Sequence, residues 1–214
     1  MKRRPRLPRR APRVRTSRLR LARSFFKRDR RDDGGPIGSP VVVGLGNPGR
    51  SYERTRHNAG YLVADELAKR HDGSWRKRKK AEAAPVSLGL NDATLLKPTT
   101  FMNNTGSAVS EYGPEDLIVV HDDLDLEAGT VRVKVGGGAG GHNGLRSVIG
   151  RVGNDFVRVR IGIGRPPAGV TVTDYVLSRM DPAVKAAIPT AADAVEFVVE
   201  HGPEAAMNRF NVRA

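Results

Sequence analysis

At 214 residues, the chain is long enough for one globular domain with a sizeable core, and nothing in its composition requires two. The absence of cysteine excludes disulfides, thiolate zinc sites and a cysteine nucleophile, and it suits a reducing compartment. No apolar run approaches the roughly 20 residues of a membrane span, and no secretory signal pattern occurs, so we expect a cytoplasmic protein without membrane contact.

The net charge of +14 is unevenly distributed along the chain. Residues 1–33 hold 15 basic and three acidic residues, a local charge of +12, whereas the rest of the chain holds 22 basic and 20 acidic residues. If the folded part binds RNA, it must therefore do so through locally clustered basic residues and not through its overall charge.

The first 38 residues form an extension that is rich in arginine and proline and poor in aromatic residues. We expect this segment to be disordered, because its composition cannot bury a core. Four interpretations of it stay open: a solvated tail, a stretch outside the true reading start, an arm that touches RNA or the ribosome, and an organelle transit peptide. The folded domain is therefore expected over residues 39–214.

From Val41 onwards, segments with strand character alternate with segments of helical character. Strands are expected at 41–43, 85–88, 94–97, 117–120, 130–135 and 156–163, with the second and third joined by a turn at 91–92. Helices are expected at 59–71 with Asn58 as N-cap, shortly after Asn103, and over 181–201 with an interruption at Pro189. This alternation predicts a single α/β domain in which helices cover both faces of a mixed, twisted sheet.

The apolar run 41–43 leads into Gly44-Leu45-Gly46-Asn47-Pro48-Gly49, which is typical of a buried strand that ends in a tight turn. In open α/β sheets such strand ends bind ligands, so we place the functional site here. The spacing also matches the dinucleotide-binding pattern G-x-G-x-x-G, which keeps an NAD-dependent enzyme as an alternative. Against it, Pro48 removes an N–H that would bind phosphate, and the acid expected about twenty residues later (Asp65 or Glu66) falls within a helical pattern.

Four segments, taken together, identify a family. They are GLGNPGRSYERTRHNAG at 44–60, KPTTFMN at 97–103, HDDLDLEAG at 121–129, and GGGAGGHNGLRS at 136–147 followed by RIGIGRPP at 160–167. In this order they resemble the signatures of bacterial peptidyl-tRNA hydrolases, which cleave the ester between a stalled peptide and its tRNA and so release the tRNA for reuse in translation. The resemblance covers residues 41–167, and the four motifs in order are far more specific than any single one.

The resemblance implies roles for individual residues. His57 matches the family's proton acceptor, Asp122 matches the acid that supports it, and Asn47 helps to distinguish blocked from free aminoacyl groups. Further residues are implied in binding the peptidyl-tRNA: Tyr52, Phe101, Asn103, Lys134, Asn143 and Arg160. We add His142 as a further candidate for substrate binding. By the same resemblance, we expect a monomeric enzyme with no metal and no cofactor.

These residue types suit ester hydrolysis on chemical grounds. Histidine can activate water near neutral pH, and a carboxylate on its other ring nitrogen fixes the ring and stabilises the imidazolium. An asparagine amide can donate to a carbonyl oxygen. A metal site is the alternative use of the histidines and aspartates, but the sequence contains no H-E-x-x-H or comparable spacing.

The glycine run at 136–141 is expected to form a flexible loop that lets the substrate backbone approach closely and could act as a lid. His142 follows it, and both a bond to loop backbone and a direct catalytic role stay open. Basic residues flank the loop, and we expect some of them to clamp tRNA phosphates, with a solvated strand face as the alternative: Arg132, Lys134, Arg160 and Arg165.

The chain departs from the family between Ala108 and Leu117, where it is several residues shorter. We therefore expect a truncated helix after Asn103, which would reduce activity or stability if that helix holds the 101–103 loop in place. The main alternative to an enzyme is a non-catalytic RNA-binding relative, such as the plant-type splicing factors with this fold. A pure binding protein has no chemical reason to keep the following residues together: His57, Asp122, Asn47 and Asn143.

Overall fold

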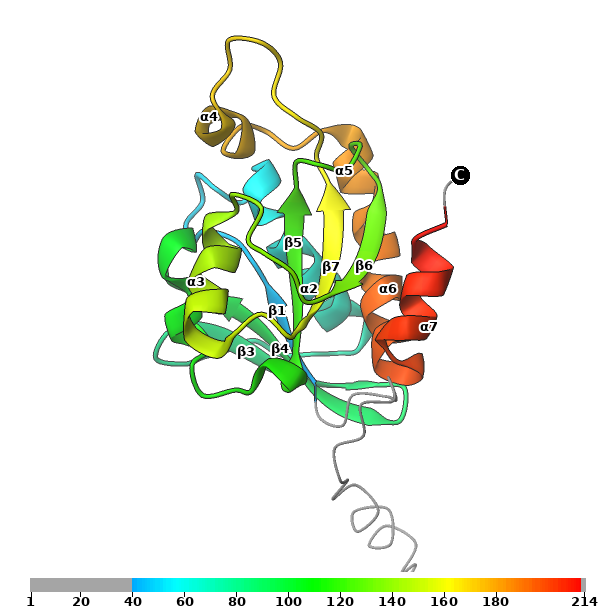
Figure 1. The fold of residues 1–214 in the computed structure, drawn as a ribbon. Helices are drawn as coiled ribbons and strands as arrows, with labels where there is room; N and C mark the ends of the chain where they lie inside the picture. The colour runs from blue at the N-terminus through cyan, green and yellow to red at the C-terminus, as the bar shows by residue number, and fades with distance from the viewer. Residues whose placement is uncertain (1–39, 213–214) are drawn as a thin grey trace, which may run out of the picture. The chain divides into compact units, whose positions relative to one another are not determined.

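A computed structural model describes residues 40–212, and the extension predicted at 1–38 lies outside the described residues. These residues form a seven-stranded sheet in the order β2-β3-β4-β1-β5-β7-β6 (Figure 1). The strands are β1 Val41–Gly44, β2 Arg76–Lys77, β3 Ala81–Leu88, β4 Asn91–Pro98, β5 Leu117–Asp123, β6 Val131–Val135 and β7 Val157–Gly162. β1 runs parallel to β4 and β5, and β5 runs parallel to β7, while the pairs β2–β3, β3–β4 and β6–β7 are antiparallel. The predicted mixed sheet is confirmed.

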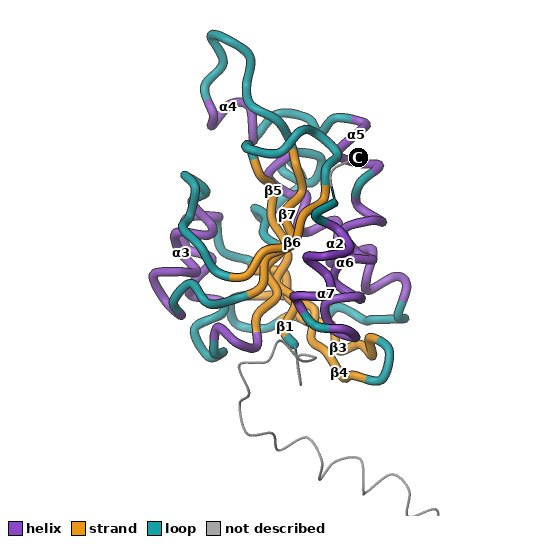
Figure 2. The backbone as a smooth tube through the Cα atoms, turned by 45° about the vertical axis from the view of Figure 1, so that its right-hand side comes forward, coloured by secondary structure: helices purple, strands orange, loops and turns teal. Residues whose placement is uncertain are grey.

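Helices lie on both sides of this sheet, as predicted. They are α2 Ala59–Arg70, α3 Asn143–Val152, α4 Val172–Val176, α5 Pro182–Ala186, α6 Ile188–His201 and α7 Pro203–Phe210, with 3-10 helices η1 Arg56–Asn58, η2 Met102–Ala108 and η3 Pro114–Asp116. Figure 2 shows α3 on one side of the strands and α2, α6 and α7 on the other. Within residues 40–212, no helix has both the length and the apolar character needed to cross a membrane.

Two hydrophobic layers hold the helices to the sheet. Alternate residues of a strand point to opposite faces, so Val42 and Ile118 join the layer under α2 and α6, whereas Val43 and Val119 join the layer under α3. All four side chains are fully buried. A continuous apolar run is therefore what the central parallel strands β1 and β5 require.

The end of β1 and the start of α2 touch backbone to backbone. A Cβ on Gly44 would collide with the carbonyl oxygen of Gly60, and a Cβ on Gly60 would collide with the carbonyl oxygen of Val120. Leu45 N–H also donates to the Val120 carbonyl at 2.9 Å. The two glycines therefore let α2 begin directly against the ends of β1 and β5. This contact places η1 beside the carboxyl end of β5.

The hairpin β3–β4 differs in detail from the prediction. Both strands are longer than expected, and the turn between them is formed by Gly89 and Leu90, while the predicted turn residues Asn91 and Asp92 pair within β4. Gly89 has a φ of 59°, which a two-residue hairpin turn requires and glycine adopts without strain. The expected pairing is thus confirmed, but the expected turn position is wrong.

Two helix expectations also need comment. Asn58 makes no capping hydrogen bond to α2, because its side chain bonds to the backbone of Asn47 instead. The predicted C-terminal pair of helices is present as α5 and α6, but the break falls at Ala187, and Pro189 lies in the first turn of α6. The helix expected after Asn103 is the 3-10 helix η2, followed by turns and η3 before β5.

Candidate active site

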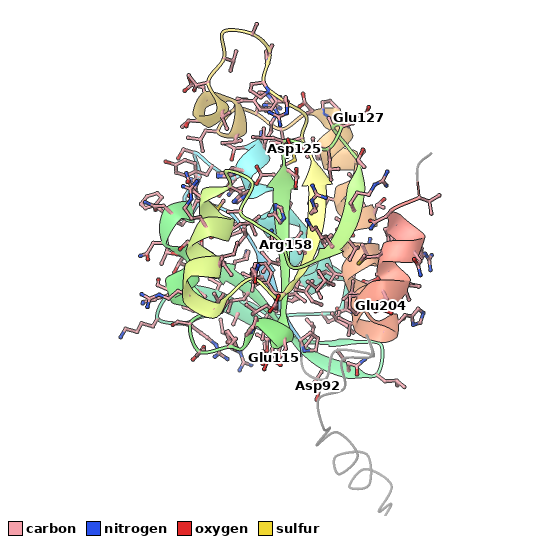
Figure 3. All side chains as sticks on the ribbon, in the orientation of Figure 1. Asp92, Glu115, Asp125, Glu127, Arg158 and Glu204 are labelled. Atoms are coloured by element: carbon pink, nitrogen blue, oxygen red, sulfur yellow. The ribbon has the colours of Figure 1, made fainter. Side chains whose placement is uncertain are left out.

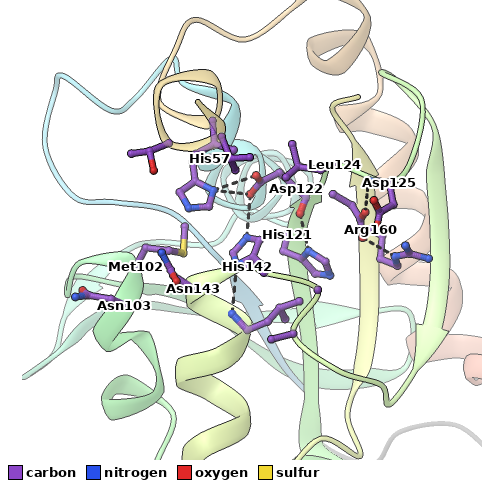
Figure 4. Close-up of a pocket in the computed structure, with 18 of the residues that line it drawn as sticks. His57, Met102, Asn103, His121, Asp122, Leu124, Asp125, His142, Asn143 and Arg160 are labelled. Carbon is purple, nitrogen blue, oxygen red and sulfur yellow. Dashed lines mark hydrogen bonds and ion pairs between the residues drawn. The ribbon is translucent and has the colours of Figure 1, made fainter. Parts of the chain in front are cut away.

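His57 and Asp122 meet where β1 and β5 end. His57 lies in η1, and its Nδ1 is 3.0 Å from both carboxylate oxygens of Asp122, the sixth residue of β5 (Figure 4). A carboxylate at neutral pH only accepts hydrogen bonds, so Nδ1 carries the proton and donates it. Within residues 40–212, no hydrogen bond occupies Nε2 of His57. The ring therefore has the tautomer that a general base needs.

Asp122 is buried and accepts from two histidines. Its Oδ1 also lies 3.1 Å from Nε2 of His142. Burial would raise the pKa of the Asp122 carboxyl, but the charges and hydrogen bonds of His57 and His142 hold it well below its usual range. Asp122 is therefore ionised throughout the neutral pH range.

His142 precedes α3 and caps its first turn. Its Nδ1 accepts from the backbone N–H groups of Gly144 at 3.1 Å and Leu145 at 3.3 Å. A ring nitrogen that accepts hydrogen bonds carries no proton, so the proton of neutral His142 lies on Nε2 and is donated to Asp122. Of the two roles left open by the sequence, the structure supports backbone bonding, although the backbone is that of α3 and not of the glycine loop.

Asn47 is fixed by three hydrogen bonds. Its backbone N–H donates to Asn58 Oδ1 at 2.9 Å, its carbonyl accepts from Asn58 Nδ2 at 3.0 Å, and its Oδ1 accepts from the Met102 N–H at 2.8 Å. Because Oδ1 accepts, the amide nitrogen of Asn47 stays available as a donor. The N–H groups of Leu45 and Asn47 are bonded internally and Pro48 has none, so three of the turn's residues offer no donor to a phosphate, and Asp65 binds Lys97 from within α2. The dinucleotide-binding alternative therefore has no support.

A cleft of about 540 Å³ opens over these residues. Besides His57, Asp122, His142 and Asn47, it is lined by Phe101, Met102, Asn103, His121, Asp123, Leu124, Asp125, Lys134, Gly138, Ala139, Gly140, Gly141, Asn143, Leu145, Arg158, Arg160, Val172, Thr173, Val176 and Leu177. One cleft thus collects nine of the ten sequence-predicted site residues.

Comparison with known proteins agrees with this geometry. The model of the family described as peptidyl-tRNA hydrolase matches residues 41–214. The chain therefore belongs to the peptidyl-tRNA hydrolase family. A peptidyl-tRNA hydrolase from Rubrobacter xylanophilus is 72% identical over 172 residues, which cover 80% of this chain and 100% of that protein. One from Mycobacterium tuberculosis is 48% identical over 182 residues, which cover 79% of this chain and 95% of that protein.

Solved structures of the peptidyl-tRNA hydrolase family share the fold. The crystal structure of peptidyl-tRNA hydrolase from Acinetobacter baumannii matches with a TM-score of 0.76 and 34% sequence identity, over 83% of this chain and 96% of that one. The four motifs that suggested the family thus lie in a chain whose sequence and fold both match it.

The residues predicted to contact the substrate are more exposed in this member of the peptidyl-tRNA hydrolase family than His57 and His142 are. Phe101, Asn103 and Asn143 are exposed in the cleft, and Asn143 Oδ1 accepts from Arg146 at 2.9 Å. Tyr52 is the one predicted site residue that does not line the cleft. Its ring meets Phe101 edge to face at 6.3 Å, so its place in the structure is that of a support for Phe101.

Only some of the predicted basic residues reach the cleft. Lys134 and Arg160 line it, and Arg160 Nε binds Asp123 at 2.8 Å. Arg132 turns towards α7, where it donates to the Phe210 carbonyl at 2.8 Å, and it does not line the cleft. Arg165 pairs with Asp125 at the surface, next to the cleft.

Arg158 holds the glycine loop and was not singled out by the sequence. It lies against the sheet (Figure 3) with 3% exposure, and its guanidinium donates to the carbonyl oxygens of Gly137 and Gly138. It also stacks over Phe156 at 4.8 Å. Arg158 lies within the strand predicted at 156–163, but arginine is rarely buried, so nothing in the sequence indicated that it would hold a loop.

The segment that contains α4 covers the cleft and was also missed. Its residues Val172, Thr173, Val176 and Leu177 line the cleft. Arg56, next to His57, anchors it through Asp181 at 2.7 Å and through the Tyr175 ring at 4.2 Å. The segment did carry local signals that the sequence analysis did not use: Pro-Pro-Ala-Gly at 166–169 favours a turn, and Thr171 caps α4 by accepting from the Asp174 N–H at 3.1 Å. These signals predict a short helix but not its place over the cleft.

Among the described residues, His57, Asp122 and His142 form a cluster whose donor atoms all lie within 4.8 Å of one another. A metal ion could use such atoms only if both ring nitrogens that face Asp122 lost their protons. For His142 this would leave no proton on the ring, because its Nδ1 accepts from α3. The cluster is therefore better suited to hydrogen bonding than to metal binding.

Proposed function

We infer that this chain hydrolyses the ester bond between tRNA and a peptide or N-blocked aminoacyl group, and so releases free tRNA. Membership of the peptidyl-tRNA hydrolase family gives the reaction. The observation that carries the mechanism is the buried His57–Asp122 pair with Nε2 of His57 unbonded in the cleft.

In the proposed mechanism, His57 Nε2 takes a proton from a water molecule as its oxygen attacks the ester carbonyl carbon. Asp122 holds the ring through Nδ1 and stabilises the imidazolium that forms. The tetrahedral intermediate then breaks its bond to the ribose oxygen, which receives the proton back from His57. The products are a peptide carboxylate and a tRNA with a free 3′ end.

Asn47 is proposed to orient the acyl group. Its amide nitrogen is a fixed donor, because Oδ1 is held by the Met102 N–H and the backbone is held by Asn58. A donor that needs no reorganisation can bind the carbonyl oxygen as it gains charge. Asn103 and Asn143 offer further amide groups along the same cleft, where a blocked amino group could be recognised as an amide.

The basic side of the cleft is proposed to bind tRNA. Lys134 and Arg160 offer charge to phosphates without reading bases, which suits an enzyme that must act on many tRNAs. Phe101, supported by Tyr52, offers an exposed aromatic face to the 3′ end of the substrate.

We further propose that residues 39–214 contain the whole catalytic domain and act as a monomer in the cytoplasm without a metal ion. Every residue given a role here lies after Val41. Deletion of residues 1–38 should therefore leave turnover of a short ester substrate unchanged. If turnover were lost, the extension would have to be counted as part of the site.

The deciding experiment measures release of labelled N-acetyl-aminoacyl groups from a short RNA ester. The protein should release them at the same rate with and without EDTA, and His57→Ala should release almost none. The unblocked aminoacyl ester serves as the matched substrate and should be hydrolysed much more slowly. Tight RNA binding without hydrolysis would instead identify a non-catalytic relative, and loss of activity in EDTA would identify a metal enzyme.

A further inference from the structure

We propose that His142 is a positioning residue that limits the action of Asp122 on His57, so that His57 stays unprotonated at neutral pH. The inference rests on the proposed role of His57 as general base. A base that pairs with a fully available buried carboxylate would hold its proton too firmly and would be protonated at the start of the reaction.

The geometry gives His142 a direct effect on the pair. Oδ1 of Asp122 receives hydrogen bonds from His57 at 3.0 Å and from His142 at 3.1 Å, so the two imidazoles share one oxygen (Figure 4). The two rings lie 4.8 Å apart. The positive end of the His142 N–H dipole therefore points at the carboxylate oxygen that also accepts from His57. It offsets part of the negative charge that would otherwise stabilise a proton on His57.

The start of α3 keeps His142 in this state. The Nδ1 atom accepts two backbone N–H groups, from Gly144 and Leu145, so a second proton there would remove both bonds. It would also place positive charge at a helix N-terminus, where the helix dipole disfavours it. The cap of α3 thus fixes which nitrogen of His142 donates to Asp122.

The other charged and titratable groups nearby are engaged elsewhere. His121 meets the His142 ring at 5.2 Å, but burial lowers the pKa of His121 to about 3, so His121 is neutral at neutral pH. Asp123 is paired with Arg160, and the Arg56 guanidinium is turned to Asp181. Asp122 is therefore the charged group that hydrogen-bonds to the His57 ring, and His142 shares that carboxylate.

Two substitutions separate the two hydrogen-bonding roles of His142, which are the cap of α3 through Nδ1 and the bond to Asp122 through Nε2. In His142→Asn, the side-chain oxygen can still cap α3, but the short amide does not reach Asp122. In His142→Gln, the longer amide can donate to Asp122 from near the position of Nε2, but it is a poor cap. If His142 tunes His57, His142→Asn should have the larger effect. If His142 only caps α3, His142→Gln should have the larger effect.

The test is an NMR titration of the His57 ring in the resting enzyme, with its signal assigned by its loss in His57→Ala. In His142→Asn the midpoint should rise by about one pH unit, a tenfold change in the protonation equilibrium, and in His142→Gln it should stay within a few tenths of the parent value. An unchanged or lower midpoint in His142→Asn would overturn the proposal. The proposal would also be overturned if only His142→Gln changed the His57 midpoint and lowered the melting temperature.

The pH–rate profile provides the functional readout. His142→Asn should lose about tenfold in kcat near pH 6 and approach the parent at pH 9, because raising the pH restores the unprotonated base. If the NMR midpoint rises but the rate profile does not move, His142 does tune His57 and the proposed role of His57 as base is the part that fails. If neither moves, the tuning itself is wrong.

Discussion

The two ends of the cleft are held in different ways. At the catalytic end, Asn47, His57 and Asp122 are buried, and each is fixed by hydrogen bonds to residues from another element. At the proposed RNA end, Lys134 is exposed, and the glycine loop is fastened to the sheet through Arg158. The difference indicates that the chemistry depends on fixed geometry, whereas the phosphate contacts tolerate adjustment. Substitutions at the two ends should therefore fail in different ways.

The largest effect is expected for His57→Ala. Loss of general base catalysis should lower kcat by roughly 10²–10⁴, while tRNA binding stays within a few-fold, because His57 lies at the catalytic end. Single-turnover hydrolysis and a binding titration measure the two quantities. His201→Ala, an exposed histidine at the end of α6, is the matched control and should behave as the parent does. Near-parent turnover by His57→Ala would remove the basis for the proposed mechanism.

Asp122→Asn should keep the fold and lower kcat, by less than His57→Ala does. The amide can donate to Nδ1 of His57 and thereby favour the tautomer with a proton on Nε2, which cannot accept from water. The rate should be measured across pH, together with the melting temperature. A profile that matches the parent at every pH would mean that Asp122 does not support His57.

The free energy of unfolding should also fall in acid because of titratable groups buried at the catalytic end. The contribution of His121 can be measured separately. Burial lowers the pKa of His121 to about 3, whereas an unfolded histidine titrates near 6.5, so between these values the unfolded chain binds a proton that the folded chain does not. The free energy of unfolding should therefore fall by about 1.4 kcal/mol per pH unit on acidification below 6.5. Denaturant titrations should find this part of the slope absent in His121→Asn, and equal slopes would show that His121 is accessible to protons.

The smallest effect is expected at the RNA end. Lys134→Gln should weaken tRNA binding a few-fold, leave kcat unchanged, and reduce the slope of log K against log [salt] by roughly 0.7–0.9 if one phosphate contact is lost. Lys69→Gln on α2, exposed and outside the cleft, is the matched control. An unaltered slope in Lys134→Gln would place Lys134 outside the RNA contact.

Much of the architecture could be predicted because the central strands carry their own signal. The runs at 41–43 and 117–120 are uninterrupted and apolar, as strands buried on both faces must be, and their ends locate the site. The proximity of His57 to Asp122 followed from the family resemblance and from the rule that parallel strands end at one edge. Composition and spacing alone did not establish it.

What could not be predicted has physical reasons. Helix α3 begins at a histidine cap, which is not among the usual capping residues, so its start carried no recognisable signal. Asn58 had the sequence of a cap, but its side chain bonds to the backbone of Asn47, eleven residues earlier in the chain, which only the fold brings next to it. Arg158 is buried against the usual preference of arginine, and only the folded loop supplies the carbonyls that make this possible.

At Gly138 in the glycine loop, the effect of a side chain on substrate binding can be separated from its effect on folding. A Cβ there would meet no atom within 4 Å, and Gly138 is not among the glycines with positive φ, in contrast to Gly137, Gly140 and Gly141. The protein itself therefore has no steric or conformational need for glycine at 138. If Gly138→Ala lowers activity, the added methyl group must therefore collide with the bound substrate. The substitution would thus show how closely the substrate approaches the glycine loop.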